Sequence, residues 1–261
     1  GALSSAGPGG IGGYEAANGG GAAKSGPDDP FGPFCRDKAG CMLIPLFLVG
    51  GLTVGSYAFL PSTWQKTRHR MGRRNRWREG TLYLTFDDGP SEYTVELSRG
   101  LKERRVQATF FLLGENMEGR RKMVEELVKD GHLIGNHSYH HVQLNKLSIK
   151  EATGEIEKTN RLIREWTGEA PVYIRPPYGA WSLELEKVVD MIPVFWNVDS
   201  LDWKLQNKEQ VLSCLSGQVE EGDVILMHDG YQSSVDAAFA LVDHLQKQGF
   251  VFVNVEEMVL E

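Results

Sequence analysis

The sequence has 261 residues, of which 41% are hydrophobic and 24% charged, so it contains enough apolar material for a globular core. Its formal net charge of −7 argues against a nucleic-acid-binding surface over the whole molecule. The three cysteines include no Cys-x-x-Cys pair, which argues against a disulfide framework and against a thiolate zinc site.

The N-terminal part of the chain has a different composition from the rest. Residues 1–34 are rich in Gly, Ala, Ser and Pro, and we expect a disordered tail there. Residues 42–60 form an uncharged apolar run of 19 residues, close to the ~20 that span a bilayer. We predict a transmembrane signal anchor, with a cleaved signal peptide and a buried helix as the alternatives.

Residues 61–80 form a basic linker that contains seven lysine or arginine residues: Lys66, Arg68, Arg70, Arg73, Arg74, Arg76 and Arg78. By the positive-inside rule, this cluster would hold the following domain in the cytoplasm. Long domains are often translocated regardless of flanking charge, so charge alone leaves the orientation open.

From residue 81 to residue 261, short apolar runs alternate with amphipathic helical patterns, as in a single α/β catalytic domain. We expect strands at 81–84, 108–113, 132–135, 172–174, 194–198, 224–227 and 250–253. We expect helices at 91–105, 117–130, 148–166, 183–190, 207–219 and 234–247. This alternation implies parallel strands with right-handed crossovers. Because the region is short for an eight-stranded barrel of ~250 residues, we predict an incomplete (β/α) barrel of about seven parallel strands. An open doubly wound sheet is the alternative.

Two adjacent carboxylates follow the first expected strand. Residues 85–90 read Thr-Phe-Asp-Asp-Gly-Pro, and this segment on its own is more typical of a turn than of a functional site. Neighbouring side chains of a regular strand point to opposite faces. We therefore expect Asp87 and Asp88 to have different roles.

Ionisable residues also follow four later strands, at segments 136–141, 175–179, 199–203 and 228–230. Parallel α/β folds build their active sites at the carboxyl ends of their strands. His137 and His141 are four residues apart, so a helical turn would place both imidazoles on one face. With Asp88 they would form a two-histidine, one-carboxylate metal site for zinc or a similar divalent ion. We expect His140 to face away from that site.

Together, these five segments resemble the motifs of the polysaccharide deacetylases with a NodB-type domain, the fourth carbohydrate esterase family, over residues 80–258. The resemblance includes the order of the motifs and implies a distorted (β/α) barrel. It also implies metal-dependent removal of acetyl groups from N-acetylated sugars, as in peptidoglycan N-acetylglucosamine deacetylases.

The resemblance implies a role for each matching residue. Asp87 would be the general base, oriented by Arg175, and His228 the general acid, tuned by Asp202. The other implied site residues are the metal ligands Asp88, His137 and His141, the oxyanion donor Tyr178 through its backbone N–H, and the pocket walls Trp203 and Leu226. Trp196 is interpreted instead as a core residue and Asp199 as a cap of the following turn. Asp229 is left out of the catalytic set, because it could bond a nearby helix end as easily as a reactant.

We therefore expect a hydrolase that removes N-acetyl groups from a cell-wall or extracellular polysaccharide, specifically from N-acetylglucosamine residues of peptidoglycan. The expected cofactor is Zn²⁺, with Co²⁺, Mn²⁺ or Ni²⁺ as alternatives. The expected location is extracytoplasmic, membrane-anchored or secreted, without nucleic acid or an obligate protein partner. The alternatives are an O-acetyl esterase acting on a xylan-type polymer and an inactive glycan-binding barrel.

Overall fold

The computed structural model describes residues 80–258. The predicted Gly-rich tail, the predicted membrane anchor and all but the last residue of the basic linker lie outside the described residues. Within the described part of the chain, no helix is long and apolar enough to cross a membrane.

Strands and helices alternate along the chain. The strands are β1 (Thr81–Gly89), β2 (Thr109–Leu112), β3 (Leu133–Asn136), β4 (Tyr173–Ile174), β5 (Ile192–Pro193), β6 (Val198–Asp199), β7 (Val224–His228) and β8 (Val251–Val253). The α-helices are α2 (Thr94–Glu103), α3 (Gly114–Met117), α4 (Arg121–Lys129), α5 (Ile149–Thr167), α6 (Leu183–Val188), α7 (Asp202–Leu205), α8 (Lys208–Leu215) and α9 (Gln232–Lys247). Short 3₁₀ helices are η2 (Leu144–Lys146), η3 (Pro177–Gly179) and η4 (Val255–Met258).

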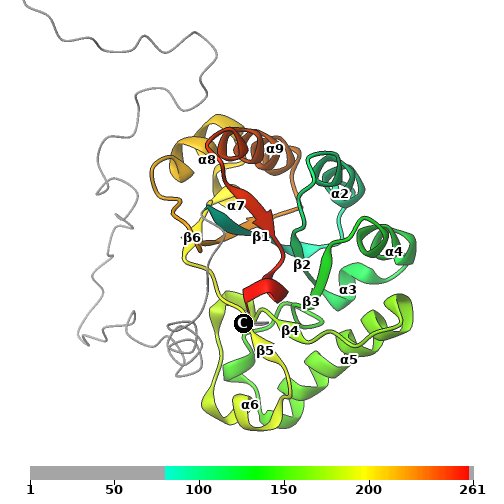
Figure 1. Cartoon of the computed structure of the whole chain (residues 1–261). Helices are drawn as coiled ribbons and strands as arrows, with labels where there is room; N and C mark the ends of the chain where they lie inside the picture. Colours follow the sequence, from blue (N-terminus) through cyan, green and yellow to red (C-terminus); the bar gives the residue numbers. More distant parts are fainter. Residues whose placement is uncertain (1–79, 259–261) are drawn as a thin grey trace, which may run out of the picture.

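All strand pairs in the sheet are parallel, and the strand order is β5-β4-β3-β2-β1-β7-β6. β8 pairs with the first residues of β1, outside this order. The end strands β5 and β6 are not paired with each other in the described part of the chain, so the barrel does not close. The strands lie at the centre of the molecule and the long helices lie outside them (Figure 1). The predicted distorted, incomplete barrel of about seven parallel strands is confirmed.

The side chains of β1 alternate between two environments, as expected for a strand that is covered on both faces. Leu82, Leu84 and Phe86 belong to the large core that also includes Leu97 of α2 and Leu241 of α9. Tyr83 belongs to a second cluster, inside the barrel, with residues of β2, β4 and β7. Further along the interior face of β1 come Thr85 and then Asp87, so this face becomes polar towards the carboxyl end of the strand.

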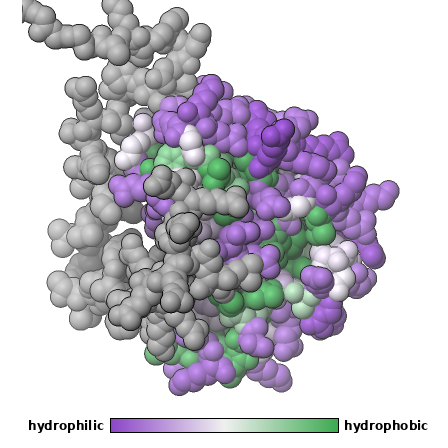
Figure 2. All heavy atoms as spheres, viewed as in Figure 1, coloured by the Kyte–Doolittle hydropathy of each residue, from purple (hydrophilic) through white to green (hydrophobic). Residues whose placement is uncertain are grey.

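The outer helices bury apolar side chains and expose polar ones, and hydrophilic residues cover much of the visible described surface on the face shown in Figure 2. The predicted capping box of α5 is present: the Ser148 hydroxyl accepts the N–H of Glu151, whose carboxylate accepts the N–H of Ser148. The predicted helix 117–130 is divided into α3 and α4. Gly119, with φ of 74°, lies between them in the left-handed region, which interrupts a right-handed helix.

Two further predicted elements differ from the structure. The helix predicted from residue 91 begins at Thr94, because the Ser91 hydroxyl donates to the carbonyl of Asp229 (2.5 Å) and accepts the N–H of Tyr93 (3.0 Å). The strand predicted at 194–198 is replaced by the short strands β5 and β6. Between them, the carbonyls of Val194 and Phe195 accept from the Arg175 guanidinium instead of from a neighbouring strand (3.2 and 3.4 Å).

Candidate active site and metal centre

The parallel register brings the predicted site residues to one end of the barrel. Asp87, near the end of β1, is paired with His228 at the end of β7. On the other side of β1, β2 pairs with β3 up to Asn136, the residue that precedes His137. Asn136 is paired in turn with Ile174, the residue that precedes Arg175. Segments that are up to 141 positions apart in the sequence therefore meet at the carboxyl edge of the sheet.

The carboxylates of Asp87 and Asp88 both approach His137, although strict strand alternation predicts opposite directions. The distances from His137 Nε2 are 3.7 Å to Asp87 Oδ2 and 3.4 Å to Asp88 Oδ1. Asp88 has a φ of 70°, and the pairing with β2 shifts between Asp87 and Gly89. This irregularity turns Asp88 towards the same site as Asp87, as a β-bulge does next to many active sites.

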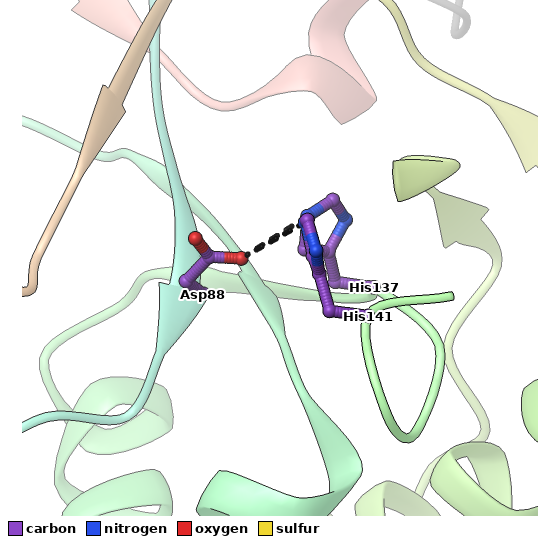
Figure 3. A group of neighbouring side chains, drawn as sticks. All are labelled: Asp88, His137 and His141. Atoms are coloured by element: carbon purple, nitrogen blue, oxygen red, sulfur yellow. Dashed lines mark ion pairs between the residues drawn. The ribbon is translucent and has the colours of Figure 1, made fainter. Parts of the chain in front are cut away.

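Asp88, His137 and His141 form a candidate metal centre, with one potential ligand atom from each residue within 4.8 Å of the other two. Asp88 extends from β1 towards the two imidazoles, which belong to the loop after β3 (Figure 3). Asp88 Oδ1 lies 3.4 Å from His137 Nε2 and 3.5 Å from His141 Nε2. Ligands of a tetrahedral zinc, each ~2.0–2.1 Å from the ion, are ~3.3 Å apart. The arrangement therefore fits a divalent metal with open positions for water and substrate.

The loop between β3 and η2 carries both histidines, and the predicted helical turn is wrong. Ser138 and His141 have φ values of 66° and 52°, which a right-handed helix excludes. His137 Nδ1 donates to the carbonyl of Arg175 (2.6 Å), which leaves Nε2 free to bind a metal. His141 Nδ1 lies 3.2 Å from the Tyr178 hydroxyl, and the two rings pack edge to face at 4.6 Å. Both imidazoles therefore present Nε2 to Asp88.

The directions in which the pKa values of Asp88 and His141 are shifted suit metal binding. Burial favours a higher pKa for Asp88, but the close approach of His137 and the charges of His137, His141 and His228 outweigh burial, and the pKa is lowered. Burial, followed by the charge of His137, lowers the pKa of His141. Asp88 Oδ1 is buried and has no hydrogen-bond donor among the described residues, as expected for an atom that binds a metal instead.

Asp87 is held by Arg175, whose side chain is 0% exposed. Arg175 Nη1 donates to Asp87 Oδ1 (2.8 Å) and to the hydroxyl of Thr85 (2.7 Å). The guanidinium lies 4.4 Å from the Phe111 ring centre and 5.6 Å from that of Trp196. A carboxylate with this partner is fixed in orientation.

His228 and Asp202 form a second ion pair at the site. His228 Nδ1 donates to Asp202 Oδ1 (2.8 Å), and the backbone N–H of His228 donates to Oδ2 (2.8 Å). Burial favours a lower pKa for His228, but the hydrogen bond and the charges of Asp202, Asp87 and Asp88 raise the pKa to about 9. The imidazolium is thus the stable form at neutral pH, and its Nε2 lies 4.0 Å from Asp88 Oδ2.

The three remaining predicted residues lie around this centre. Tyr178 has a φ of 60°, and its backbone N–H donates to no described residue. The side chain of Trp203 is about half exposed, which places it at the rim of the site. Leu226 is buried on β7, paired with Thr85 and Asp199.

The residues left out of the predicted site have structural contacts. His140 contacts Glu155 of α5 (2.8 Å) rather than the metal centre. Asp199 Oδ1 accepts the N–H of Leu201 (2.9 Å) in a turn. Asp229 accepts the hydroxyl of Thr94 at the start of α2, and burial raises its pKa to about 6. Trp196 packs against the interior cluster of the barrel.

Two contributions were not predicted from the sequence. Thr85 links the site to β7, because its hydroxyl accepts from Arg175 and donates to the carbonyl of Ile225 (2.7 Å). Its position two residues before Asp87, on the same strand face, was a signal that could have revealed this role. The Tyr178 hydroxyl contacts His141 through a loop conformation for which we find no sequence signal.

The fold and the site together define a class: a parallel (β/α) barrel with an Asp-His-His centre and two ion pairs, Asp87–Arg175 and His228–Asp202, at the carboxyl ends of its strands. The family model "Polysaccharide deacetylase" matches residues 74–193. The chain belongs to this polysaccharide deacetylase family.

Relatives of known name are consistent with this assignment. The peptidoglycan-N-acetylmuramic acid deacetylase PdaC of Bacillus subtilis is 38% identical over 178 residues, which are 68% of this chain and 38% of PdaC. A peptidoglycan-N-acetylglucosamine deacetylase of Bacillus cereus is 35% identical over 77% of this chain and 76% of that protein. The solved structure of PdaC superimposes with a TM-score of 0.67 and 36% identity, covering 69% of this chain and 90% of that chain.

Proposed function

We propose that this protein hydrolyses the N-acetyl groups of N-acetylglucosamine residues in peptidoglycan and releases acetate. The observation that carries the proposal is the pair of acid–base residues beside the candidate metal centre. Asp87 is anchored by Arg175, and His228 is kept cationic by Asp202. One residue is set to accept a proton and the other to donate one, as amide hydrolysis requires.

The three ligands would hold Zn²⁺, with Co²⁺, Mn²⁺ or Ni²⁺ as alternatives, because two imidazoles and one carboxylate suit these ions. A divalent ion in this centre would lower the pKa of a bound water to about 7 and polarise the amide carbonyl. The protein's part is to fix the ligand atoms, and the Arg175 carbonyl and the Tyr178 hydroxyl hold the two imidazoles through their Nδ1 atoms.

Asp87 would take the proton from the attacking water as the C–O bond forms. The carbonyl oxygen then gains negative charge, and the N–H of Tyr178 is free to donate to it. Losing one such donor typically costs ~3 kcal/mol of transition-state stabilisation. When the C–N bond breaks, the amine leaves only if it is protonated, and the cationic His228 would supply that proton. The products are acetate and a free amino sugar.

Removal of N-acetyl groups from N-acetylmuramic acid is the second candidate function, because PdaC is named for that activity. O-acetyl esterase activity on a xylan-type polymer is a third candidate, since the same groups suit an ester. A glycan-binding barrel without catalysis is a different class. The intact Asp87–Arg175 and His228–Asp202 pairs argue against that class, because binding requires neither a base nor an acid.

We also propose an extracytoplasmic location, either membrane-anchored through residues 42–60 or secreted. The support is the apolar character of that segment and the peptidoglycan named as the substrate of the relatives, which lies outside the cytoplasmic membrane. The polysaccharide is the only partner that this function requires.

The test is acetate release by the full chain, supplied with Zn²⁺, from N-acetylglucosamine oligomers, peptidoglycan and acetylated xylan. We expect release from peptidoglycan, with the free amine located on glucosamine by mass spectrometry of the digested product. A free amine on muramic acid would support the second candidate, and release from xylan alone would support the third. If none of the three polymers yields acetate, the enzymatic function is wrong.

A further inference from the structure

The loop that carries both histidine ligands, residues 137–141, is attached to one side of α5. The Glu155 carboxylate accepts the backbone N–H groups of Tyr139 (3.3 Å) and His140 (2.9 Å) through Oε2. One helical turn further on, the Thr159 hydroxyl donates to the carbonyl of Ser138 (2.9 Å). Residues four apart share a helix face, so α5 holds the loop from a single face.

The start of the loop has its own connection to the same helix. The side chain of Asn136 accepts the N–H of Ser138 (2.7 Å) and donates to the carbonyl of Ile156 (2.8 Å) and to Asn160 Oδ1 (2.7 Å). α3 contributes two further bonds, in which the N–H groups of Gly114 and Glu115 donate to the carbonyls of Ser138 and Tyr139 (both 3.0 Å).

The loop conformation requires such support. Ser138 and His141 both have left-handed backbone angles, which cost L-residues ~1–2 kcal/mol each. A strained backbone of this kind persists only when several contacts with the surrounding structure hold it in place. Because the two strained residues lie at or beside the ligands His137 and His141, a relaxed loop would change the separation of the two imidazoles.

Glu155 binds the middle of the loop, between the two ligands. Its side chain is 17% exposed, and it makes charge-assisted hydrogen bonds to two consecutive backbone N–H groups. Oε1 lies 2.8 Å from Nδ1 of His140, whose side chain is half exposed. No contact joins Glu155 to Asp87, Asp88 or His228 among the described residues, so it is neither a ligand nor an acid–base group.

We propose that Glu155 is a positioning residue that presets the separation of His137 and His141 and thereby sets the metal affinity of the site. The proposal rests on the metal centre of the proposed function. It adds a supporting residue that lies outside the five segments at the strand ends. The carboxylate acts through the loop backbone, so its removal loosens the ligand pair without removing a ligand.

The test compares the full chain with the substitutions Glu155→Ala, Glu155→Gln and Glu157→Ala. Glu157 is the matched control, because it is an exposed glutamate of the same helix and makes no hydrogen bond or ion pair among the described residues. Three quantities are measured: the zinc dissociation constant, by competition with a chromophoric chelator; the visible absorption of the Co²⁺-loaded protein; and the melting temperature of the metal-free protein. The spectrum reports ligand geometry and would not change if Glu155 were only structural.

Supporting groups around metal ligands typically contribute 10–100-fold in affinity, and we expect Glu155→Ala to weaken zinc binding by about that factor. The Co²⁺ spectrum should change as well. Glu155→Gln should lie between Glu155→Ala and the wild type, because its amide oxygen still accepts an N–H, and it replaces Glu155→Ala if that variant does not fold. Glu157→Ala should match the wild type.

His140→Ala separates the two functions of the carboxylate. It removes the ring contact and keeps the bonds to the backbone, so zinc affinity should stay within about threefold of the wild type if the backbone bonds are the important ones. A lower melting temperature with unchanged zinc affinity and Co²⁺ spectrum in Glu155→Ala would overturn the proposal. Absence of Zn²⁺ and of Co²⁺, Mn²⁺ and Ni²⁺ binding by the wild-type chain would overturn the metal centre itself, and the proposal with it.

Discussion

Asp87 and Asp88 are neighbours in the sequence, but their carboxylates have different partners. Asp87 is buried against Arg175, whereas Asp88 faces three histidines and retains a buried oxygen without a donor. The expectation of different roles came from strand alternation. In the structure the difference arises from the backbone irregularity at Asp88 and from what surrounds each carboxylate.

Asp87→Asn tests the role of the general base. Asparagine can still accept from Arg175 but cannot take a proton from water, so turnover should fall by ~10²–10⁴ while zinc content is unchanged. Breaking a buried ion pair costs ~3–5 kcal/mol of the free energy of unfolding, so rates must be measured where circular dichroism shows a folded variant. Near-normal turnover in Asp87→Asn would exclude Asp87 as the base. His137→Ala is the comparison variant and should lose zinc instead.

The raised pKa of His228 makes both the stability of the fold and the expected reaction rate depend on pH. Its pKa is raised to about 9, so the cation persists through neutral pH and is lost as the pH rises through that value. The ion pair with Asp202 therefore stabilises the fold fully below the ordinary pKa of ~6.5, and this stabilisation disappears towards pH 9. If His228 is the general acid, we expect the reaction rate to fall as the pH rises through about 9.

Asp202→Asn tests this assignment. The substitution removes the charge that holds the proton on His228, while burial continues to favour the neutral imidazole. The alkaline limb of the kcat profile should therefore move to lower pH by at least one unit, measured between pH 5 and 11. A limb that does not move would show that His228 is not the group titrating there.

At the scale of the elements, sequence periodicity predicted which strand ends carry the site residues but not the conformation of the loops that follow. The strand patterns placed Asp88 and Arg175 at strand ends, and parallel pairing brought them together without further information. The loop of His137 and His141 was predicted as a helical turn because residue spacing is the only local signal there. Its shape is set by α3 and α5, which are distant in the sequence, and no local pattern reports those contacts.

The helices offer a paired prediction about packing. A Cβ at Gly100 of α2 would lie 2.2 Å from the ring of Phe239 in α9, and that ring is held against the Arg104 guanidinium at 4.5 Å. Gly100→Ala should lower the free energy of unfolding by ~1–3 kcal/mol. A Cβ at Gly154 of α5 would meet nothing within 4 Å, and Gly154→Ala should raise the free energy of unfolding by up to ~1 kcal/mol.

Urea denaturation of both variants measures these changes. Equal stabilities for the two alanine variants would contradict the close packing of α2 against α9. Since neither glycine touches the site, the rate of acetate release should be unchanged in both variants under conditions where they are folded.

For the whole molecule, the alternation of strands and helices predicted parallel strands, and the short length of the region favoured an incomplete barrel over an open doubly wound sheet. The split of the fifth strand was not predictable. The Arg175 guanidinium donates to the carbonyls that would have continued the strand. Its position depends on its contacts with Asp87, which lies 88 positions earlier in the sequence, and with Thr85, which lies 90 positions earlier. This departure from the predicted pattern occurs beside the site, where a side chain replaces a neighbouring strand as the hydrogen-bond partner.

The central claim is that the Asp88–His137–His141 centre holds a metal on which acetate release depends. Metal content and acetate release from peptidoglycan should be measured on the same samples of the full chain, before chelation, after chelation and after return of zinc. We predict that both quantities are lost together and restored together, and that Asp88→Asn restores neither. Undiminished acetate release from the metal-free wild type would contradict the account.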